Sequence, residues 1–162
     1  MAAVNRNELK QLISDAFGSV PHPGPQNISN EHHCEECKEV VDGFADLTWQ
    51  AIPIRTIDAN YDKLPLFSPA AYHHFLPAFL QRSLDEPEGP TREFTFYSLT
   101  TKPDDWLKER TRLFTAAQIR CILLYLEFEQ ERFEELQNWL ETDKVMTKRL
   151  AYWKGLLEKN IS

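Results

Sequence analysis

The sequence predicts a mainly α protein: a single-domain helical bundle over residues 1–162, with a C-terminal helical hairpin and one minor β element. Three observations predict this class. Apolar residues recur with the 3.6-residue period of an amphipathic helix along most of the chain. Capping residues and prolines at first helical positions precede several of these runs. Only one segment alternates in the manner of a strand.

The N-terminal third is predicted to hold two helices joined by a loop. The first covers residues 5–17, with Asn5 or Asn7 as its cap and Gly18 at its end. Prolines and glycines make residues 18–33 a loop that leads to a cysteine and histidine box. A second helix runs from about residue 34 to 44.

The middle of the chain contains the strongest single helix signal. A cap at Thr48 is expected to start a short turn, and residues 53–67 to form one short helix and a loop. Ser68 is a good N-cap and Pro69 fits the first helical position. Pro77 lies inside the apolar run, so it should kink this helix or split it near residues 73–76.

The alternating segment is Glu93–Leu99, which is rich in β-formers and is therefore predicted to be a strand. Residues 102–112 are expected to form a loop or a short helix.

Two long helices are predicted over residues 115–159. Thr115 and Gln118 form a capping box that opens the first, and the second runs from about Asp143 to Glu158 after a break at Thr142–Asp143. If they fold back as a hairpin, acidic side chains of the first face basic ones of the second: Glu127, Glu131, Glu134 and Glu135 opposite Lys144, Lys148, Arg149 and Lys154.

The chemistry of the chain is concentrated in His32-His33-Cys34-Glu35-Glu36-Cys37. Cys34 and Cys37 share one face of a helix that begins here. Unpaired N–H groups and the partial positive charge of a helix start lower the pKa of a thiol toward the thiolate that zinc requires. Because zinc binds four ligands, we predict a structural zinc site with Cys34, Cys37 and one of the two histidines. The fourth ligand stays open among His22, the other histidine of the box, His73, His74, Glu36 and Asp42.

Other interpretations of the box remain. The thiols can be two reduced structural cysteines, a disulfide or a redox pair; a redox pair normally follows a strand, and the two glutamates between the thiols raise the thiol pKa unless a cation offsets them. An enzyme with an open zinc site would use a bound water, with Glu36, His73 or His74 as its base. The zinc-protease and zinc-deaminase patterns are absent. Cys121 is expected to be a small buried apolar side chain.

The net charge of −7 is uneven. Residues 1–101 have 7 basic and 14 acidic side chains, a balance of −7, whereas residues 102–162 have 11 of each. This acidity argues against nucleic acid and favours a basic protein partner, for example a basic toxin that the protein would neutralise. The sequence has no signal-peptide run and no apolar stretch long enough to span a membrane, so a cytoplasmic protein is expected. The acidic residues are densest around the box: Glu31, Glu35, Glu36, Glu39, Asp42 and Asp46.

Three matching pieces resemble a family of uncharacterised bacterial proteins that is known as a domain of unknown function. They are the loop Val20 to Pro23, the box His32 to Cys37 and the helix Ser68 to Leu80, followed by the Phe94-to-Leu99 segment and the helix opening at Thr115. The resemblance spans roughly residues 10–130 and implies no activity. It places the histidine of the box at His32, so the predicted zinc ligands are His32, Cys34 and Cys37. The resemblance does not identify the fourth ligand, for which we take His73 from the open candidates.

Overall fold

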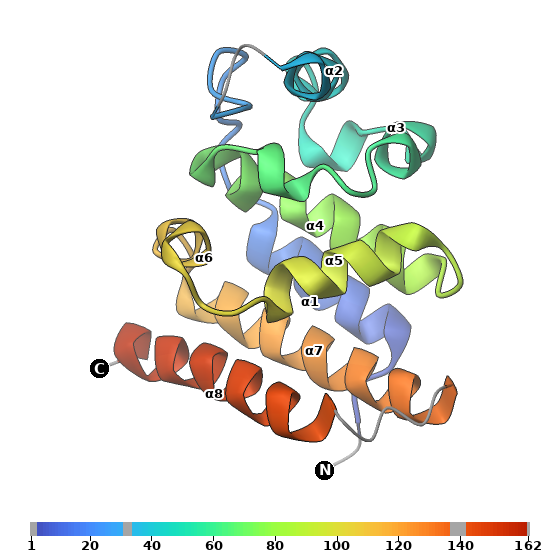
Figure 1. Ribbon diagram of the computed structural model, residues 1–162, viewed down its shortest axis with the longest axis vertical. Coiled ribbons are helices and arrows are strands. Elements are labelled where there is room, and N and C mark those ends of the chain that lie inside the picture. Colours follow the sequence, from blue (N-terminus) through green and yellow to red (C-terminus); the bar gives the residue numbers. More distant parts are fainter. Residues whose placement is uncertain (1–2, 31–33, 137–141, 162) are drawn as a thin grey trace.

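A computed structural model describes residues 3–30, 34–136 and 142–161. Within these residues the protein is all-α, which confirms the predicted class; an isolated bridge between Ser29 and Phe67 is the only β pairing there. Figure 1 shows the arrangement. The elements are α1 (Arg6–Phe17), α2 (Glu35–Phe44), the 3₁₀ helix η1 (Trp49–Ala51), α3 (Ile54–Ala59), the 3₁₀ helix η2 (Leu64–Leu66), α4 (Pro69–Asp85), α5 (Pro90–Thr100), α6 (Asp105–Thr111), α7 (Ala116–Leu136) and α8 (Thr142–Ile161).

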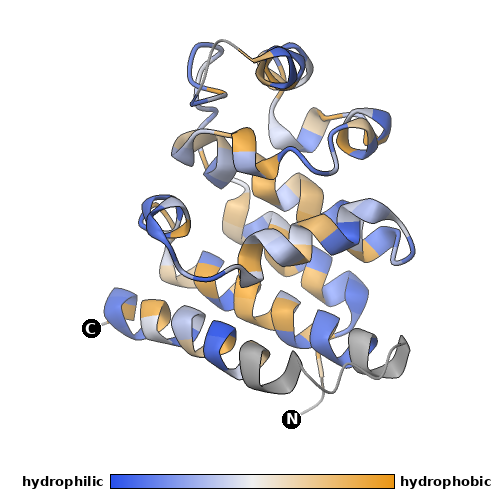
Figure 2. Ribbon diagram, in the orientation of Figure 1, coloured by the Kyte–Doolittle hydropathy of each residue, from blue (hydrophilic) through white to orange (hydrophobic). Residues whose placement is uncertain are grey.

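The central element is α4, against which α1, α3, α5, α6 and η1 all pack. Its start is the predicted one: the Ser68 hydroxyl accepts the N–H of Ala71 at 3.1 Å, and Pro69 occupies the first turn. The helix continues through Pro77 to Asp85, so the predicted split is wrong. Packing on both sides outweighs the one backbone bond that proline removes. In Figure 2 the hydrophobic colour concentrates on the helices at the centre of the molecule.

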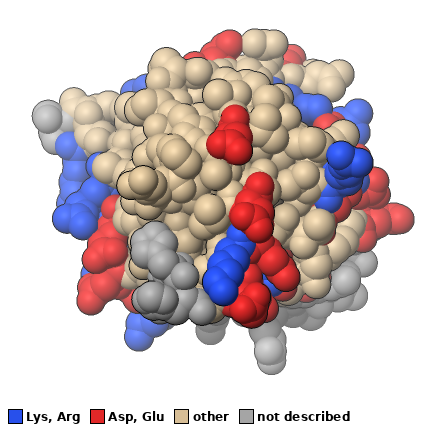
Figure 3. Space-filling view, turned by 90° about the horizontal axis from the view of Figure 1, so that it is seen from above, with Lys and Arg blue, Asp and Glu red and all other residues tan. Residues whose placement is uncertain are grey.

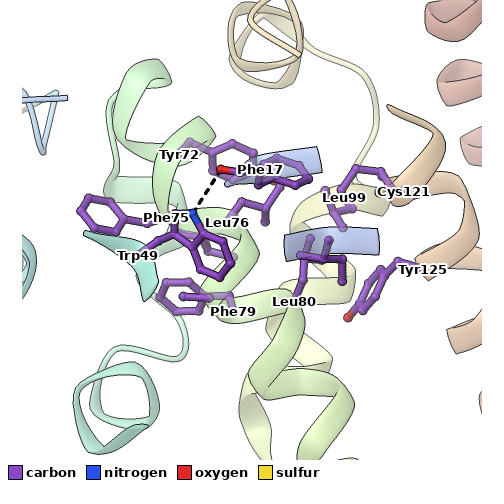
Figure 4. Packing of buried hydrophobic residues seen from close by; sticks show 14 of the residues in the cluster. Phe17, Trp49, Tyr72, Phe75, Leu76, Phe79, Leu80, Leu99, Cys121 and Tyr125 are labelled. Carbon is purple, nitrogen blue, oxygen red and sulfur yellow. Dashed lines mark hydrogen bonds between the residues drawn. The ribbon is translucent and has the colours of Figure 1, made fainter. Parts of the chain in front are cut away.

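An aromatic cluster joins the C-terminal end of α2 to α4. The ring of Phe44 lies 5.1 Å from those of Phe67 and Phe75, both in edge-on contact, and stacks on Phe79 at 6.0 Å. Each fully buried phenylalanine contributes about 1.5–3 kcal/mol through removal of its surface from water. On the other side of α4, the Trp49 indole N–H donates to the carbonyl of Phe17 at 3.2 Å, which ties η1 to the end of α1 (Figure 4).

The predicted strand Glu93–Leu99 is wrong, because these residues lie within α5. Pro90 stands at the first helical position and favours a helix start. The side chains of Phe96 and Leu99 are buried at helical spacing, whereas Phe94 and Tyr97 are 42% and 40% exposed. Contact with α4 therefore decides the conformation against the local β propensity, which is a context-dependent preference.

The C-terminal helices begin as the sequence predicts. Thr115 and Gln118 exchange both hydrogen bonds of the capping box, at 3.0 and 3.2 Å, and open α7. Helices α7 and α8 lie side by side (Figure 1), while the residues that would turn the chain, 137–141, lie outside the described ones, so the hairpin stays a prediction. Of the predicted charge pairing, Glu134, Glu135 and Lys144 have side chains outside the described set. Arg149 instead donates to the carbonyl of Thr100 at 2.9 Å.

A buried carboxylate joins α5 to α7. Glu129 is fully buried and accepts from Arg92 at 2.5 Å and from Arg132 at 2.9 Å. Burial raises the pKa of Glu129, and the two guanidinium groups oppose that rise. In the described parts of the chain, none of the helices combines the length and the apolar character that a membrane crossing needs.

Candidate functional site

Cys34 and Cys37 meet at the start of α2, where they form a disulfide with their Cα atoms 5.2 Å apart. Cys34 is the N-cap residue: its backbone is extended and its sulfur accepts the N–H of Cys37 at 3.0 Å. Cys34 is partly exposed, whereas Cys37 is 1% exposed and faces inward with Val40 and Phe44. The prediction that a helix begins at the cysteine pair is confirmed, and the two sulfurs lie together at its start.

Each of the two glutamates between the cysteines has a lysine partner. Lys38 lies 3.3 Å from Glu35, and both side chains are well exposed. Lys63, from the segment between α3 and η2, lies 3.3 Å from Glu36 and has a side chain only 13% exposed. Burial lowers the pKa of Lys63, but the hydrogen bond to Glu36 and the charge of Asp62 outweigh it and hold the pKa above its usual value. Lys38 and Lys63 are therefore the cations that offset the charges of the two glutamates beside the thiols. Lys63 is distant in the sequence, so no local pattern could have identified it.

His22 and His74 lie next to each other, with ring centroids 5.2 Å apart. The His74 Nε2 atom accepts the N–H of Trp49 at 3.0 Å, so Nδ1 is the atom that donates to the carbonyl of Val20, also at 3.0 Å. His22 accepts the N–H of Gly24 at Nδ1. The His74 imidazole is thus neutral in this arrangement, and its Nε2 lone pair is used. The role of the two histidines is to fix the loop before α2 to α4 and η1.

His73 points away from this pair, toward α1 and α7. Its Nε2 atom lies 2.7 Å from the side-chain oxygen of Gln118, which also accepts the N–H of Thr115. The Gln118 amide nitrogen donates to Ala16, so the shared oxygen is an acceptor and His73 Nε2 is the donor. Burial lowers the pKa of His73, and the hydrogen bond to Gln118 opposes the shift.

The four predicted zinc ligands are therefore only partly assembled. Cys34 and Cys37 adjoin, His73 binds Gln118, and His32 and His33 lie outside the described residues. Within residues 3–30, 34–136 and 142–161, no three His, Cys, Asp or Glu side chains are grouped so that they could hold a metal ion. The zinc site stays a prediction, because it depends on His32.

The third cysteine has a different environment. Cys121 is buried in the middle of α7, and its thiol donates to the carbonyl of Leu12 in α1 at 3.3 Å. Burial, with a smaller contribution from the charge of Asp15, raises the pKa of Cys121 to about 11. The expectation of a small buried side chain is confirmed.

The surface around α2 is acidic but not uniformly so. Glu35, Glu36, Glu39, Asp42 and Asp46 are all exposed, as the sequence indicated. Figure 3, which looks onto this end of the molecule, shows Asp and Glu side chains separated by a broad uncharged area, with Lys and Arg beside some of them.

Two hollows lie within the described surface. The larger, about 280 Å³, lies between α1, α3, α4 and η1, and its polar side chains bind one another: Gln81 donates to Ser14, and Asp85 pairs with Lys10. The smaller, about 120 Å³, is almost entirely apolar and lies between α5 and the segment around η2. The sequence predicted a strand over Glu93–Leu99 and therefore gave no indication of this hollow, which Phe94 and Tyr97 line from α5. It is lined by Tyr61, Leu64, Pro65, Phe94, Tyr97 and Ser98.

Comparison with known proteins gives a family but no activity. No curated protein and no solved structure is significantly similar to the chain. A family model described as a family of unknown function (DUF6714) matches residues 5–156. This match covers the thiol pair, the central helix α4 and most of α8. The chain therefore belongs to this family of unknown function.

Proposed function

We propose that the protein carries out thiol–disulfide exchange with other proteins, with Cys34 as the attacking thiol and Cys37 as the resolving thiol. One observation carries the proposal: Cys34 is the partly exposed N-cap of α2 and its sulfur accepts the N–H of the buried Cys37. A helix start is the environment that lowers thiol pKa values and so supplies the nucleophilic thiolate.

The exchange follows from this arrangement. In the reduced protein, the Cys34 thiolate attacks one sulfur of a partner disulfide, forms a mixed disulfide and releases the partner's other sulfur as a thiolate. The Cys37 thiolate then attacks the Cys34 sulfur and displaces the first partner sulfur. The partner gains two electrons and becomes a dithiol after taking up two protons, while Cys34 and Cys37 become the disulfide. Burial of Cys37 leaves Cys34 as the sulfur that a partner can reach.

The charges near the pair are compatible with this chemistry. Unpaired, Glu35 and Glu36 would raise the pKa of Cys34 by like-charge repulsion. Lys38 and Lys63 offset them. The wider acidic surface supports a basic protein as the partner, as the sequence indicated. The toxin-neutralising version of this partnership stays a prediction.

A second candidate is the structural zinc site, favoured by the same two sulfurs in their reduced form. Zinc binds thiolates and imidazole in a tetrahedral site, so Cys34, Cys37 and His32 would supply three ligands. His73 would have to give up its hydrogen bond to Gln118 to be the fourth. An open zinc site with catalytic water would need the same three ligands and stays the less supported alternative.

The test is a redox titration in glutathione buffers, combined with metal analysis of the reduced protein. For an exchange protein we expect reversible conversion of the pair, with a midpoint in the range of known exchange proteins, about −120 to −270 mV. A midpoint below about −300 mV would mark a structural disulfide and contradict the proposal. One zinc per reduced chain, lost in Cys34→Ser, would instead favour the second candidate. Cys121→Ser is the matched control and should change neither result.

A further inference from the structure

The small hollow has the properties of a docking site for one apolar side chain. It is defined by Tyr61, Phe94 and Tyr97, and we call these three residues with their apolar neighbours the aromatic notch. The rings of Tyr61 and Phe94 are in edge-on contact at 5.1 Å, and Phe94 and Tyr97 remain 42% and 40% exposed. Its volume, about 120 Å³, is somewhat below the roughly 150 Å³ of a cavity that holds benzene. One aliphatic side chain therefore matches its size.

The aromatic notch is linked to the first turn of α2 through one residue, Lys63. Tyr61, Asp62 and Leu64 line it, and the residue between them, Lys63, reaches Glu36 in the first turn of α2. Helix α2, which starts at the thiol pair, also lies against α3, which precedes the notch. A Cβ atom added at Gly43 in α2 would lie 3.2 Å from the side chain of Thr56 in α3. A peptide held at Cys34 can thus extend along the 60–65 segment to the notch.

The charges at the rim favour a basic peptide. Asp62 lines the notch. Tyr97 at its other side is hydrogen-bonded to Glu93; burial, with the charge of Glu93, raises the pKa of Tyr97. Glu35 and Asp62 are already in ion pairs with Lys38 and Lys63, at 3.3 and 3.5 Å. Glu39 toward the thiol pair and Glu93 beside Tyr97 are exposed, so Lys and Arg residues that flank an apolar side chain would find an acidic partner on each side of the notch.

We propose that the aromatic notch binds the protein substrate of the thiol pair, by an aliphatic side chain that lies a few residues from the reacting cysteine and is flanked by Lys or Arg. This inference rests on the proposed exchange function and adds the class of substrate that the site selects. The aliphatic side chain supplies affinity through burial, and the flanking charges supply orientation.

The experiment uses activated peptides and the full-length reduced protein. Each peptide consists of Gly, Ser and Arg with one cysteine activated as a 2-pyridyl disulfide, and Leu is placed at several spacings from that cysteine. One control peptide has Ser in place of Leu, and another has Glu in place of Arg. The attack by Cys34 releases thiopyridone, whose absorbance gives the second-order rate constant. The small uncharged disulfide 4,4′-dithiodipyridine reports the thiol reaction without any docking.

At the best spacing, we expect the Leu peptide to react about tenfold faster than the Ser peptide, because burying one aliphatic side chain is worth at least that factor. The ratio of the two rate constants should fall to about one in Phe94→Ser. It should be unchanged in Leu113→Ser, a matched control because Leu113 is 44% exposed. Since each ratio is measured within one variant, a change in its thiol reactivity or stability cancels.

Three results overturn the inference, and they distinguish a failure of the docking site from a failure of the exchange function. If 4,4′-dithiodipyridine reacts but the Leu and Ser peptides have equal rates at every spacing, the docking site is wrong and the exchange function stands. The same conclusion follows if Phe94→Ser and Leu113→Ser keep the same ratio. If 4,4′-dithiodipyridine does not react at Cys34, both the exchange function and the docking inference fail.

Discussion

The two places where the chain buries a cysteine differ in what surrounds the sulfur. Cys37 lies in the first turn of α2, bonded to a partly exposed neighbour and close to unpaired N–H groups. Cys121 lies mid-helix between α7 and α1, where its thiol only donates to a carbonyl and its pKa is about 11. Burial alone therefore does not decide whether a cysteine is reactive. The two cysteines differ in their position along the helix and in whether an exposed cysteine is bonded to them.

The two regions are also held in place differently. Helix α2 is anchored at its C-terminal end by Phe44 in the aromatic cluster, whereas its thiol end is fixed by polar contacts. Cys37 is buried there, while Cys34 is partly exposed, so a partner would reach the thiol end at Cys34. Cys121 is buried in α7, and its thiol donates to the carbonyl of Leu12 in the neighbouring α1. The following predictions test this contrast.

Phe44→Ala should produce the largest effect. Truncation removes contacts with Phe67, Phe75 and Phe79 at the centre of the cluster, and large-to-small changes at such a phenylalanine cost about 3–5 kcal/mol of the free energy of unfolding. Urea unfolding measures it. Reduction of the Cys34–Cys37 disulfide is the comparison, and closing so short a loop contributes less than about 3 kcal/mol. A larger loss on reduction than in Phe44→Ala would show that the disulfide, and not the cluster, anchors α2.

The second prediction concerns alkylation of the reduced protein. Near neutral pH, a thiol with a pKa of about 11 has less than about a hundredth of the thiolate of an ordinary cysteine, whose pKa is about 8.5. Cys34 should therefore react with iodoacetamide more than a hundredfold faster than Cys121, as mass spectrometry of the labelled peptides can measure. Comparable rates at the two positions would remove the distinction on which the proposed function depends.

The third prediction is a loss of stability in mild acid, from the histidines that fix the loop before α2. Burial lowers the pKa of His74, against the favourable hydrogen bond to Val20, and the charge of His22 adds to the lowering. A histidine with a lowered folded pKa contributes its full stability above the unfolded value, about 6.5, and loses it progressively as the pH falls below that value. Protonation of His74 would also place a proton on Nε2, the atom that accepts the N–H of Trp49, so that two N–H groups would face each other.

Urea unfolding at about pH 7.5 and pH 5 measures this loss. His74→Gln should be less stable at pH 7.5 and should show a smaller drop between the two pH values, because it no longer titrates. The half-buried His73 contributes in the same direction, so part of the drop should persist. A His74→Gln protein with the same pH dependence as the original would contradict the assignment to His74.

What the sequence could predict was the local part of the structure. The caps at Asn5, Ser68 and Thr115 each depend on contacts three residues apart, and all three are confirmed. The proximity of the Cys34 and Cys37 sulfurs at one helix start also depends on residues three apart. The helix α5 was missed because its inner face is chosen by α4, and the partnership of Lys63 with Glu36 depends on how α3 lies beside α2. The Lys63–Glu36 contact leaves no signal in neighbouring residues, and Pro90 was the one local sign of α5.

The smallest predicted effect is that of Lys63→Met on the reactivity of Cys34. Loss of the cation leaves the charge of Glu36 unopposed in the first turn of α2, so the pKa of the Cys34 thiol should rise and alkylation near neutral pH should slow. Pairs exposed to this degree are worth about 0–1 kcal/mol, which corresponds to a decrease of up to about fivefold. Lys38→Met is the matched control, because its pair with Glu35 is more exposed and better screened. The rate measured as a function of pH separates a shift in pKa, which restores the full rate at high pH, from a loss of access, which does not. An equal effect of the two substitutions would show that Lys63 acts only through net charge and not through its contact with Glu36.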